Sequence, residues 1–281
     1  MLGRTLFGIA SLLSLSTPIT NALPQSHQAT SKEAKIDIVL HSPVRLTTNE
    51  QQKVKAEIRE YGWETAEEIV RELYQDKGYF RVEVIPLRTP TIRTKTLVLQ
   101  VNPGKRYHLV GITWRGNAAL SESELAKLIP IELGEVFSRT KIAAGLNAVK
   151  KLYDSRGYIN YACIPTPETN DDAATVAFVM VVDEGGQFRF GELDVQGIEE
   201  PHREILLNAW QGLHGRPYNA EDADNFFNHY FRSPWPKIRP ENYTIRKIDE
   251  GDRSVNYSLQ FVPYVRYLVG RNSQLEELRN P

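Results

Sequence analysis

The chain has 281 residues, of which 41% are hydrophobic, 25% are charged and 10% are aromatic, so it is long enough for one large domain or several small ones. Its net charge of −1 lacks the marked basic excess that nucleic-acid-binding proteins usually carry. The single cysteine, Cys163, excludes an intrachain disulfide and a zinc site built on several cysteines. We interpret Cys163 as a small strand residue, because nothing in the sequence indicates a lowered thiol pKa.

Residues 1–22 have the pattern of a secretory signal peptide. Arg4 supplies a positive start, an apolar run follows at residues 6–15, and small residues lead up to Ala22. The run is shorter than the roughly 20 apolar residues that span a bilayer as a helix. We therefore expect cleavage after Ala22 and export to the bacterial periplasm or the periplasmic face of the outer membrane. Residues 23–35 read as a flexible leader.

The first folded unit is expected over residues 36–104, in the order β-α-α-β-β. Its strands are expected at residues 36–40, 79–85 and 95–101. Capping boxes at Thr48–Gln51 and Thr65–Glu68 predict two helix starts, because such side chains satisfy the exposed amides of a first helical turn. Gly78 is placed to end the second helix, where a left-handed backbone is needed.

The second unit, residues 105–186, repeats this order. Its strands are expected at residues 107–115, 158–164 and 175–182. The spacing at Ser121–Glu124 predicts a capped first helix. Ile142, Leu146, Val149 and Tyr153 predict one apolar face of the second helix. Gly157 is expected to end that helix.

The third unit is expected over residues 187–263 and is followed by a charged tail at residues 264–281. Its strands are expected from Phe188, at residues 243–248 and at residues 255–262. Asn219 is placed to cap its second helix. This unit lacks a Gly-Tyr pair after the helix and has Ser233–Pro236 there instead, which predicts a longer crossing to the next strand.

The helix–Gly–strand segment recurs at one constant shift of 79 residues. Its matching positions in the first unit are Leu73, Tyr74, Gly78, Tyr79 and Pro86, and in the second unit Leu152, Tyr153, Gly157, Tyr158 and Pro165. Self-similarity at a fixed period is the signature of a repeat architecture. We therefore expect an array of small units rather than one large core.

The repeats resemble POTRA domains, the polypeptide-transport-associated modules of outer-membrane barrel assembly proteins and two-partner secretion transporters. The resemblance depends on the Val-Gly-Ile-Thr-Trp-Arg-Gly-Asn start at Val110–Asn117, the Leu-Tyr-x-x-x-Gly-Tyr segment at Leu152–Tyr158, Pro165 and the Val-Asp-Glu-Gly end at Val182–Gly185. It implies an α+β fold of three tandem β-α-α-β-β domains. Each domain would be a three-stranded mixed sheet with two helices on one face.

The sequence lacks the residue patterns of catalysis. No two histidines have the spacing of metal ligands on a helix, and no glycine-rich phosphate loop follows a strand. The carboxylate pairs Asp171-Asp172 and Asp183-Glu184 read as solvated turn residues, although a hydrolase built on them is a third hypothesis. We therefore predict no enzyme activity, no metal or cofactor, and neither a small-molecule substrate nor a nucleic-acid partner.

An open sheet edge is the expected binding feature, because its unpaired N–H and C=O groups can pair with another extended chain. The resemblance implies that the second strand of each unit is that edge. The candidate partner-binding residues are Tyr79, Phe80 and Arg81 in the first unit and Tyr158, Ile159, Asn160 and Tyr161 in the second. The plainer alternative is that Tyr158, Asn160 and Cys163 only pack or face solvent.

The expected partners are unfolded outer-membrane or secreted polypeptides, or a barrel or assembly-machine protein of the envelope. A second hypothesis is a non-catalytic scaffold of another envelope complex, such as one in cell division. In a scaffold, helix faces rather than strand edges would bind the partner.

Overall fold

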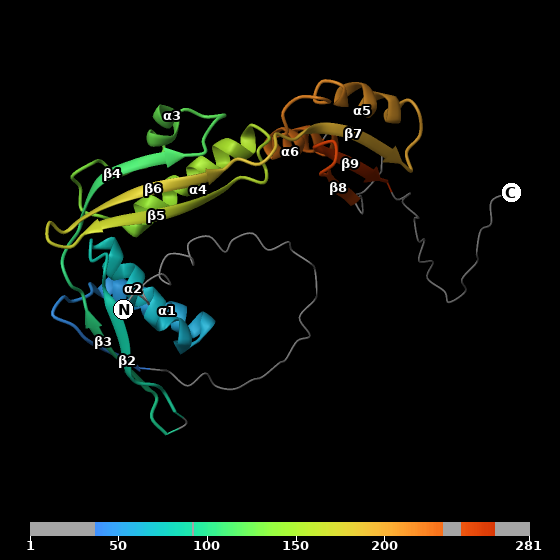
Figure 1. Ribbon diagram of the computed structural model, residues 1–281. Coiled ribbons are helices and arrows are strands. Elements are labelled where there is room, and N and C mark those ends of the chain that lie inside the picture. The colour runs from blue at the N-terminus through green and yellow to red at the C-terminus, as the bar shows by residue number, and fades with distance from the viewer. Residues whose placement is uncertain (1–36, 92, 233–242, 262–281) are drawn as a thin grey trace, which may run out of the picture. The chain divides into compact units, whose positions relative to one another are not determined.

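A computed structural model describes residues 37–91, 93–232 and 243–261 (Figure 1). The expected signal peptide, leader and charged tail lie outside these residues, as does the crossing at Ser233–Pro236. The chain divides into two compact units. Within the described residues, one comprises residues 37–152 with Tyr161–Glu184, and the other comprises Tyr153–Asn160 with residues 185–261.

The first repeat has the predicted order of elements. They are β1 (Asp37–His41), α1 (Thr48–Tyr61), a short 3-10 turn (Trp63–Thr65), α2 (Ala66–Asp76), β2 (Glu83–Arg88) and β3 (Thr96–Asn102). The sheet order is β1-β3-β2, with β1 parallel and β2 antiparallel to the central β3. Both outer strands therefore have one unpaired side within the sheet.

The second and third repeats have the same topology. The second comprises β4 (His108–Arg115), α3 (Glu122–Ala126), α4 (Arg139–Ser155), β5 (Ala162–Asn170) and β6 (Thr175–Asp183). The third comprises β7 (Arg189–Gln196), α5 (His202–Trp210), α6 (Ala220–Arg232), β8 (Tyr243–Asp249) and β9 (Ser254–Gln260). Their sheet orders are β4-β6-β5 and β7-β9-β8, again with one parallel and one antiparallel pair. The prediction of three mixed three-stranded sheets is confirmed.

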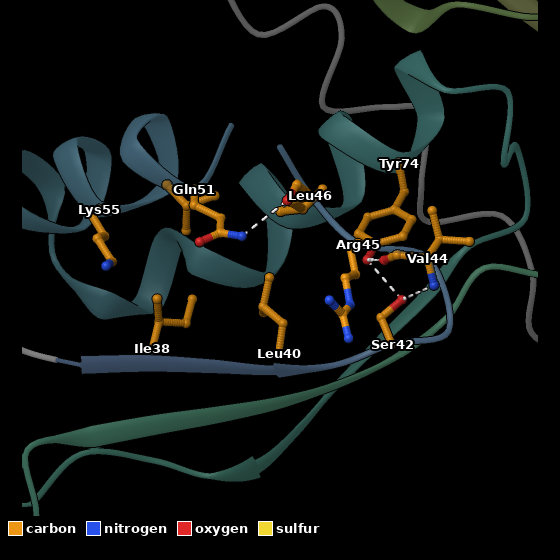
Figure 2. Close-up of a pocket in the computed structure, with 10 residues that line it drawn as sticks. Ile38, Leu40, Ser42, Val44, Arg45, Leu46, Gln51, Lys55 and Tyr74 are labelled. Carbon is orange, nitrogen blue, oxygen red and sulfur yellow. Dashed lines mark hydrogen bonds between the residues drawn. The ribbon is translucent and has the colours of Figure 1, made fainter. Parts of the chain in front are cut away.

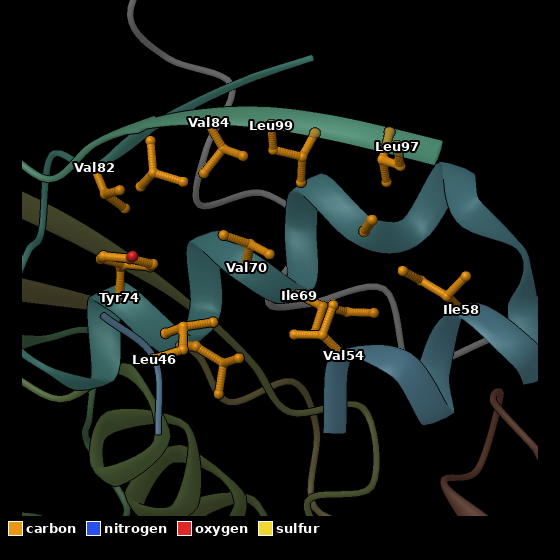
Figure 3. Close-up of a cluster of buried hydrophobic side chains, with 13 residues drawn as sticks. Leu46, Val54, Ile58, Ile69, Val70, Tyr74, Val82, Val84, Leu97 and Leu99 are labelled. Carbon is orange, nitrogen blue, oxygen red and sulfur yellow. The ribbon is translucent and has the colours of Figure 1, made fainter. Parts of the chain in front are cut away.

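The core of the first repeat lies between one face of its sheet and the helices α1 and α2. Leu97, Leu99 and Val101 alternate along β3 and are buried, because alternate strand residues point to the same face. The buried residues of α2 that face them are Ala66, Ile69, Val70, Leu73 and Tyr74. Figure 3 shows the helix side chains directed toward the strand that carries Leu97 and Leu99. These helix residues fall at i, i+3, i+4, i+7 and i+8, which is one face of an α-helix.

The third repeat has an aromatic core. Trp210 of α5 is buried, with its ring centroid 5.6 Å from that of Phe190 and 5.5 Å from that of Tyr257. Its Nε1–H donates to the main-chain carbonyl of Gly191 at 2.9 Å, which satisfies the one polar group that the indole brings into the core.

Two of the predicted capping boxes need correction. In α1 the cap is Thr47, whose side chain accepts from the N–H of Glu50, so the box begins one residue earlier than expected. Thr65 makes no capping bond to α2, because its hydroxyl instead donates to the carbonyl of Gly62 at 2.8 Å. The box at Ser121 and Glu124 is confirmed.

The second strands of the first two repeats begin later than predicted, at Glu83 and Ala162. The four residues before each strand form a turn instead. In the first repeat the N–H of Tyr79 donates back to the carbonyl of Tyr74, and the N–H of Val82 then donates to the carbonyl of Tyr79. Aromatic and β-branched residues in these turns have the composition of a strand, which explains the error.

Candidate functional site

The second strand of every repeat lies at the edge of its sheet, as the resemblance implied. β2, β5 and β8 each pair with only one strand of their own sheet. An edge strand presents a row of main-chain donors and acceptors that an incoming strand can use. These three edges are therefore candidate polypeptide-binding surfaces, and they differ in their chemistry.

Prolines interrupt the outer edge of β5. Pro165 and Pro167 lie opposite Met180 and Phe178 in a regular antiparallel ladder without a bulge. In such a ladder, residues two apart direct their main-chain groups to the same side. Proline has no N–H to donate to a neighbouring strand, so both prolines occupy positions that face away from β6. The outer edge of β5 thus lacks two successive N–H donors.

The outer edge of β8 carries no proline. Its residues Tyr243–Asp249 pair with β9 in continuous register, from Tyr243 opposite Gln260 to Asp249 opposite Ser254. The edge of β2 is intermediate, because it contains Pro86 and a break in register between Pro86 and Arg88. On main-chain chemistry, β8 is the least obstructed of the three second-strand edges.

The predicted binding residues of the first repeat lie in the turn before β2 rather than in the strand. Tyr79 packs against the core of its own repeat. Phe80 contacts the second repeat, with its ring centroid 4.9 Å from that of Phe137. Arg81 Nε lies 2.9 Å from Asp171 Oδ1. Their predicted location in an edge strand is therefore wrong, and the contacts of Phe80 and Arg81 join the first repeat to the second.

The four predicted residues of the second repeat also precede their strand. Tyr158 lies edge-on to Tyr153, with ring centroids 5.8 Å apart. Ile159 packs against the apolar core of the third sheet, and Asn160 Nδ2 lies 3.3 Å from Glu250 Oε2. Tyr161 is buried. The binding role of these residues stays a prediction. They do not belong to β5, which begins at Ala162, so they cannot bind a partner as part of that edge strand.

Asp171 and Glu184, one carboxylate from each pair interpreted as solvated turn residues, have structural partners. The Tyr107 hydroxyl donates to Asp171 Oδ1 at 2.7 Å, so Asp171 joins Tyr107 and Arg81. Glu184 Oε1 accepts the main-chain N–H groups of Ala118 and Ala119, both at 2.9 Å. These carboxylates therefore hold loops in place.

An ion-pair cluster around the buried Arg139 joins α2 to the start of α4, and sequence reasoning missed it. Arg139 is only 8% exposed, and its guanidinium nitrogens lie 2.8 Å from Glu68 Oε1 and 3.0 Å from Glu72 Oε1. Asp76, also on α2, accepts from the N–H of Thr140 at 2.7 Å. An anion at a helix N-terminus is favourable, so α2 both caps α4 and neutralises its buried cation.

The first-strand edges differ between repeats. In the second repeat Leu109 of β4 exchanges two main-chain hydrogen bonds with the segment Gly134–Glu135, at 2.9 and 2.7 Å. In the third repeat Phe190 of β7 exchanges the same two bonds with Gly215–Arg216, at 2.9 and 2.8 Å. In both repeats the segment between the two helices therefore covers the outer edge of the first strand.

A groove lies between β1 and α1 in the first repeat (Figure 2). Its volume is about 250 Å³, and Ile38 and Leu40 of β1 form part of its wall. Arg45 and Lys55 also line it, and no acidic residue does. At the Arg45 end, the Tyr74 hydroxyl donates to the main-chain carbonyl of Val44 and lies 2.7 Å from Ser42 Oγ.

The structure offers few groups for other chemistry. In the ranges that the structure describes, no cluster of three His, Cys, Asp or Glu residues could hold a metal ion. Burial raises the pKa of the Cys163 thiol, which makes it a poor nucleophile at neutral pH. None of the described helices has both the length and the apolar character needed to cross a membrane.

A protein-family model described as "POTRA: Surface antigen variable number repeat" matches residues 107–185, which span the second repeat from Tyr107 to Gly185. The second repeat is a POTRA domain. The solved structure of POTRA domains 3 to 5 of Haemophilus influenzae BamA has a TM-score of 0.55 and 19% identity, and the match covers 81% of this chain and 96% of that structure. The POTRA fold therefore extends over the first and third repeats.

Two curated relatives are named as outer-membrane assembly factors. The outer membrane protein assembly factor BamA of Neisseria meningitidis is 24% identical over 139 residues, which cover 46% of this chain and 17% of that protein. The putative outer membrane protein assembly factor of Treponema pallidum is 26% identical over 196 residues, covering 65% of this chain and 23% of that protein. The matched region is thus less than a quarter of the length of either relative.

Proposed function

We propose that the protein takes part in outer-membrane protein assembly or secretion, and that it binds extended polypeptides by adding a strand to the open edge of β8. The observation that carries this proposal is the proline-free outer edge of β8. Backbone hydrogen bonds give affinity with little demand on sequence, which suits a protein that handles many unfolded chains. The relatives named as assembly factors support the cellular role.

The proposal places the protein in the periplasm and gives it no catalytic step. Its partners are unfolded outer-membrane or secreted polypeptides, or a barrel protein of the assembly machinery. Such partners present extended strands before they fold, and an open edge pairs with extended strands whatever their side chains.

The binding test uses the purified full chain and a urea-unfolded outer-membrane barrel polypeptide that carries a fluorophore. Rapid dilution of the polypeptide into the protein should raise its fluorescence anisotropy and delay its aggregation. A folded barrel in detergent is the matched control, because its strands are already paired. Equal binding of the folded and unfolded barrels, or binding of neither, would overturn the proposal.

A scaffold that orients other proteins is the second candidate, and the contacts of Arg139 and Asp76 favour it. They join α2 of the first repeat to the start of α4 in the second, as a spacer between binding partners would require. A scaffold would lose its partner when exposed helix residues are changed. The strand-addition proposal instead predicts loss of binding when the edge of β8 is blocked.

A further inference from the structure

One edge of the first repeat is open where the other two repeats are closed. Ile38, Leu109 and Phe190 occupy the same rung of the three sheets, the second pair of the parallel ladder, opposite Leu97, Val176 and Val255. Leu109 and Phe190 each exchange two main-chain bonds with the segment between their helices. No described residue makes that pair of bonds to Ile38.

The direction of the main chain at Ile38 follows from its neighbour. The N–H of Asp37 donates to the carbonyl of Lys95 at 2.8 Å, toward β3. Because successive residues of a strand direct their main-chain groups to opposite sides, Ile38 and Leu40 direct theirs away from β3. Two residues of β1 therefore present donors and acceptors on the outer edge.

The lengths of the helix–helix segments explain the difference. The segments that close β4 and β7 belong to connections at residues 127–138 and 211–219. In the first repeat the connection is only residues 62–65, which mostly form the 3-10 turn between α1 and α2. These four residues only reverse the direction of the chain between α1 and α2, so none of them reaches the edge of β1.

The groove beside this edge has two kinds of lining. Ile38, Leu40 and Val54 give it an apolar floor, while Arg45 and Lys55 are exposed cations. Neither cation forms an ion pair with another residue in the described part of the chain. In Figure 2, Lys55 lies toward the Ile38 end of the groove and Arg45 toward the Ser42 end. The two positive charges are thus separated along β1 by the apolar floor.

We propose that the β1–α1 groove binds an extended polypeptide segment of a partner that carries an apolar residue between two acidic ones, in the pattern acidic–x–apolar–x–acidic. The segment would pair with the outer edge of β1 as Gly134–Glu135 pairs with β4. Residues two apart on a strand share a face, so the three side chains would all point into the groove. The inference rests on the proposed polypeptide binding and adds a second, charge-selective edge.

The dimensions favour side chains over a small molecule. The groove holds about 250 Å³, whereas sites for drug-sized ligands and cofactors usually enclose roughly 300–1,000 Å³. A compact ligand would also leave the main-chain donors and acceptors of the β1 edge unpaired, whereas an extended chain would pair with them. Both features fit an extended chain that lays a few side chains into the groove.

The test measures binding of fluorescent peptides to the full chain. The probe is a short threonine-rich peptide with Glu-Thr-Leu-Thr-Glu at its centre, and the control peptide has lysine in place of both glutamates. We expect the acidic peptide to bind at least about fivefold more tightly, because each exposed charge pair contributes modestly. We expect Arg45→Glu and Lys55→Glu each to weaken it about fivefold.

Lys53→Glu is the matched control, because Lys53 is an exposed cation of α1 that does not line the groove. It should leave peptide binding unchanged. Equal affinity for the two peptides, equal effects of the three variants, or no binding at all would overturn the inference. Binding of anionic phospholipid vesicles that depends on Arg45 and Lys55, without peptide binding, would assign the groove to a membrane surface and would also overturn it.

The same variants separate this inference from the proposed function. Arg45→Glu and Lys55→Glu should still bind the unfolded barrel polypeptide through β8. If unfolded polypeptide binds and the acidic peptide does not, the groove inference fails alone. If the acidic peptide binds and the unfolded polypeptide does not, the role of β8 fails and the groove stands.

Discussion

The main-chain carbonyl of Gly78 accepts a hydrogen bond from the N–H of Tyr107 at 2.8 Å. This bond ties the turn that ends α2 to the residue that precedes β4. The same bond recurs between Gly157 and Phe188, at 2.7 Å. The Gly-Tyr motif that repeats in the sequence therefore marks the turn where one repeat contacts the beginning of the next, and not the start of an edge strand.

We expect Gly78→Ala to destabilise the first two repeats. The φ angle of Gly78 is +93°, and an added Cβ would lie 2.4 Å from Val136 Cγ1. The left-handed backbone costs an alanine about 1–2 kcal/mol, and the crowding adds about 1–3 kcal/mol. The readout is alkylation of Cys163, which is buried in the second repeat and is the only thiol in the chain, across a urea series.

Gly104→Ala is the control for backbone strain alone. Gly104 has a φ of +71°, but no atom lies within 4 Å of the position that its Cβ would take. Its substitution should cost only the backbone part, about 1–2 kcal/mol. Equal losses of unfolding free energy in Gly78→Ala and Gly104→Ala would show that crowding against Val136 does not contribute to the destabilisation.

We expect Arg139→Met to loosen the contact between α2 and α4. It leaves Glu68 and Glu72 without their cation, and loss of one partner of a buried pair is costly. Because both glutamates are 40% exposed, solvent reduces the cost to about 1–2 kcal/mol. Alkylation of Cys163 across a urea series measures the loss in the free energy of unfolding.

Lys141→Met provides the comparison, since Lys141 pairs with Glu135 on the surface, with side chains 45% and 40% exposed. Exposed pairs contribute at most about 1 kcal/mol, so this variant should stay near the stability of the parent chain. A larger loss in Lys141→Met than in Arg139→Met would contradict the assigned weight of the buried cluster.

Acid should destabilise the protein partly through Glu68. Burial raises the pKa of Glu68, but the hydrogen bond and charge of Arg139 outweigh it, so the pKa lies below its ordinary value of 4.5. The unfolded chain then binds more protons than the folded one as the pH falls through 4.5, and stability is lost from there downward. Urea midpoints measured from about pH 6 to about pH 3.5 should fall less in Glu68→Gln than in the parent chain.

Glu135→Gln is the comparison for this measurement. The hydrogen bond from Lys141 lowers the pKa of Glu135, but that carboxylate is exposed on the surface. Its removal should change the pH dependence less than Glu68→Gln does. Identical slopes for the parent chain and Glu68→Gln would contradict the role assigned to the Glu68–Arg139 pair.

Local patterns in the sequence were enough to predict the order of elements. The strand expected at residues 255–262 and the capping box at Ser121 depend on a few adjacent residues, and the structure has both, with β9 at Ser254–Gln260. The starts of β2 and β5 were missed because Tyr79–Val82 and Tyr158–Tyr161 have strand-like composition but form turns. Local main-chain bonds form these turns, and side-chain contacts with distant residues, such as Phe80 with Phe137, accompany them; composition records neither.

The candidate site was less accessible from sequence. Gly134–Glu135 reads as a plain linker, and only the folded sheet shows that it closes the edge of β4. The prolines of β5 were visible, but their effect on binding depends on which side of the strand they face. That side follows from the ladder register with β6. The open edge of β1 could have been suspected from the short connection at residues 62–65.

Removing the prolines should open the edge of β5. In Pro165→Val with Pro167→Val, two N–H donors return to the outer side of the strand, and we expect polypeptide capture or self-association to increase there. Sedimentation and binding of the unfolded barrel polypeptide measure both outcomes. Pro130→Ala, an exposed loop change, should alter neither. Unchanged behaviour of the double variant would show that the prolines do not block this edge.

The most direct test of polypeptide binding at β8 is a comparison of two photo-crosslinking positions in intact cells. A photoreactive residue replaces either Lys247 of β8 or Thr166 of β5, which lies between the two prolines; both side chains are exposed. Our account predicts that Lys247 captures outer-membrane or secreted polypeptides and that Thr166 captures few or none. Equal capture at both positions, or capture at Thr166 alone, would contradict it.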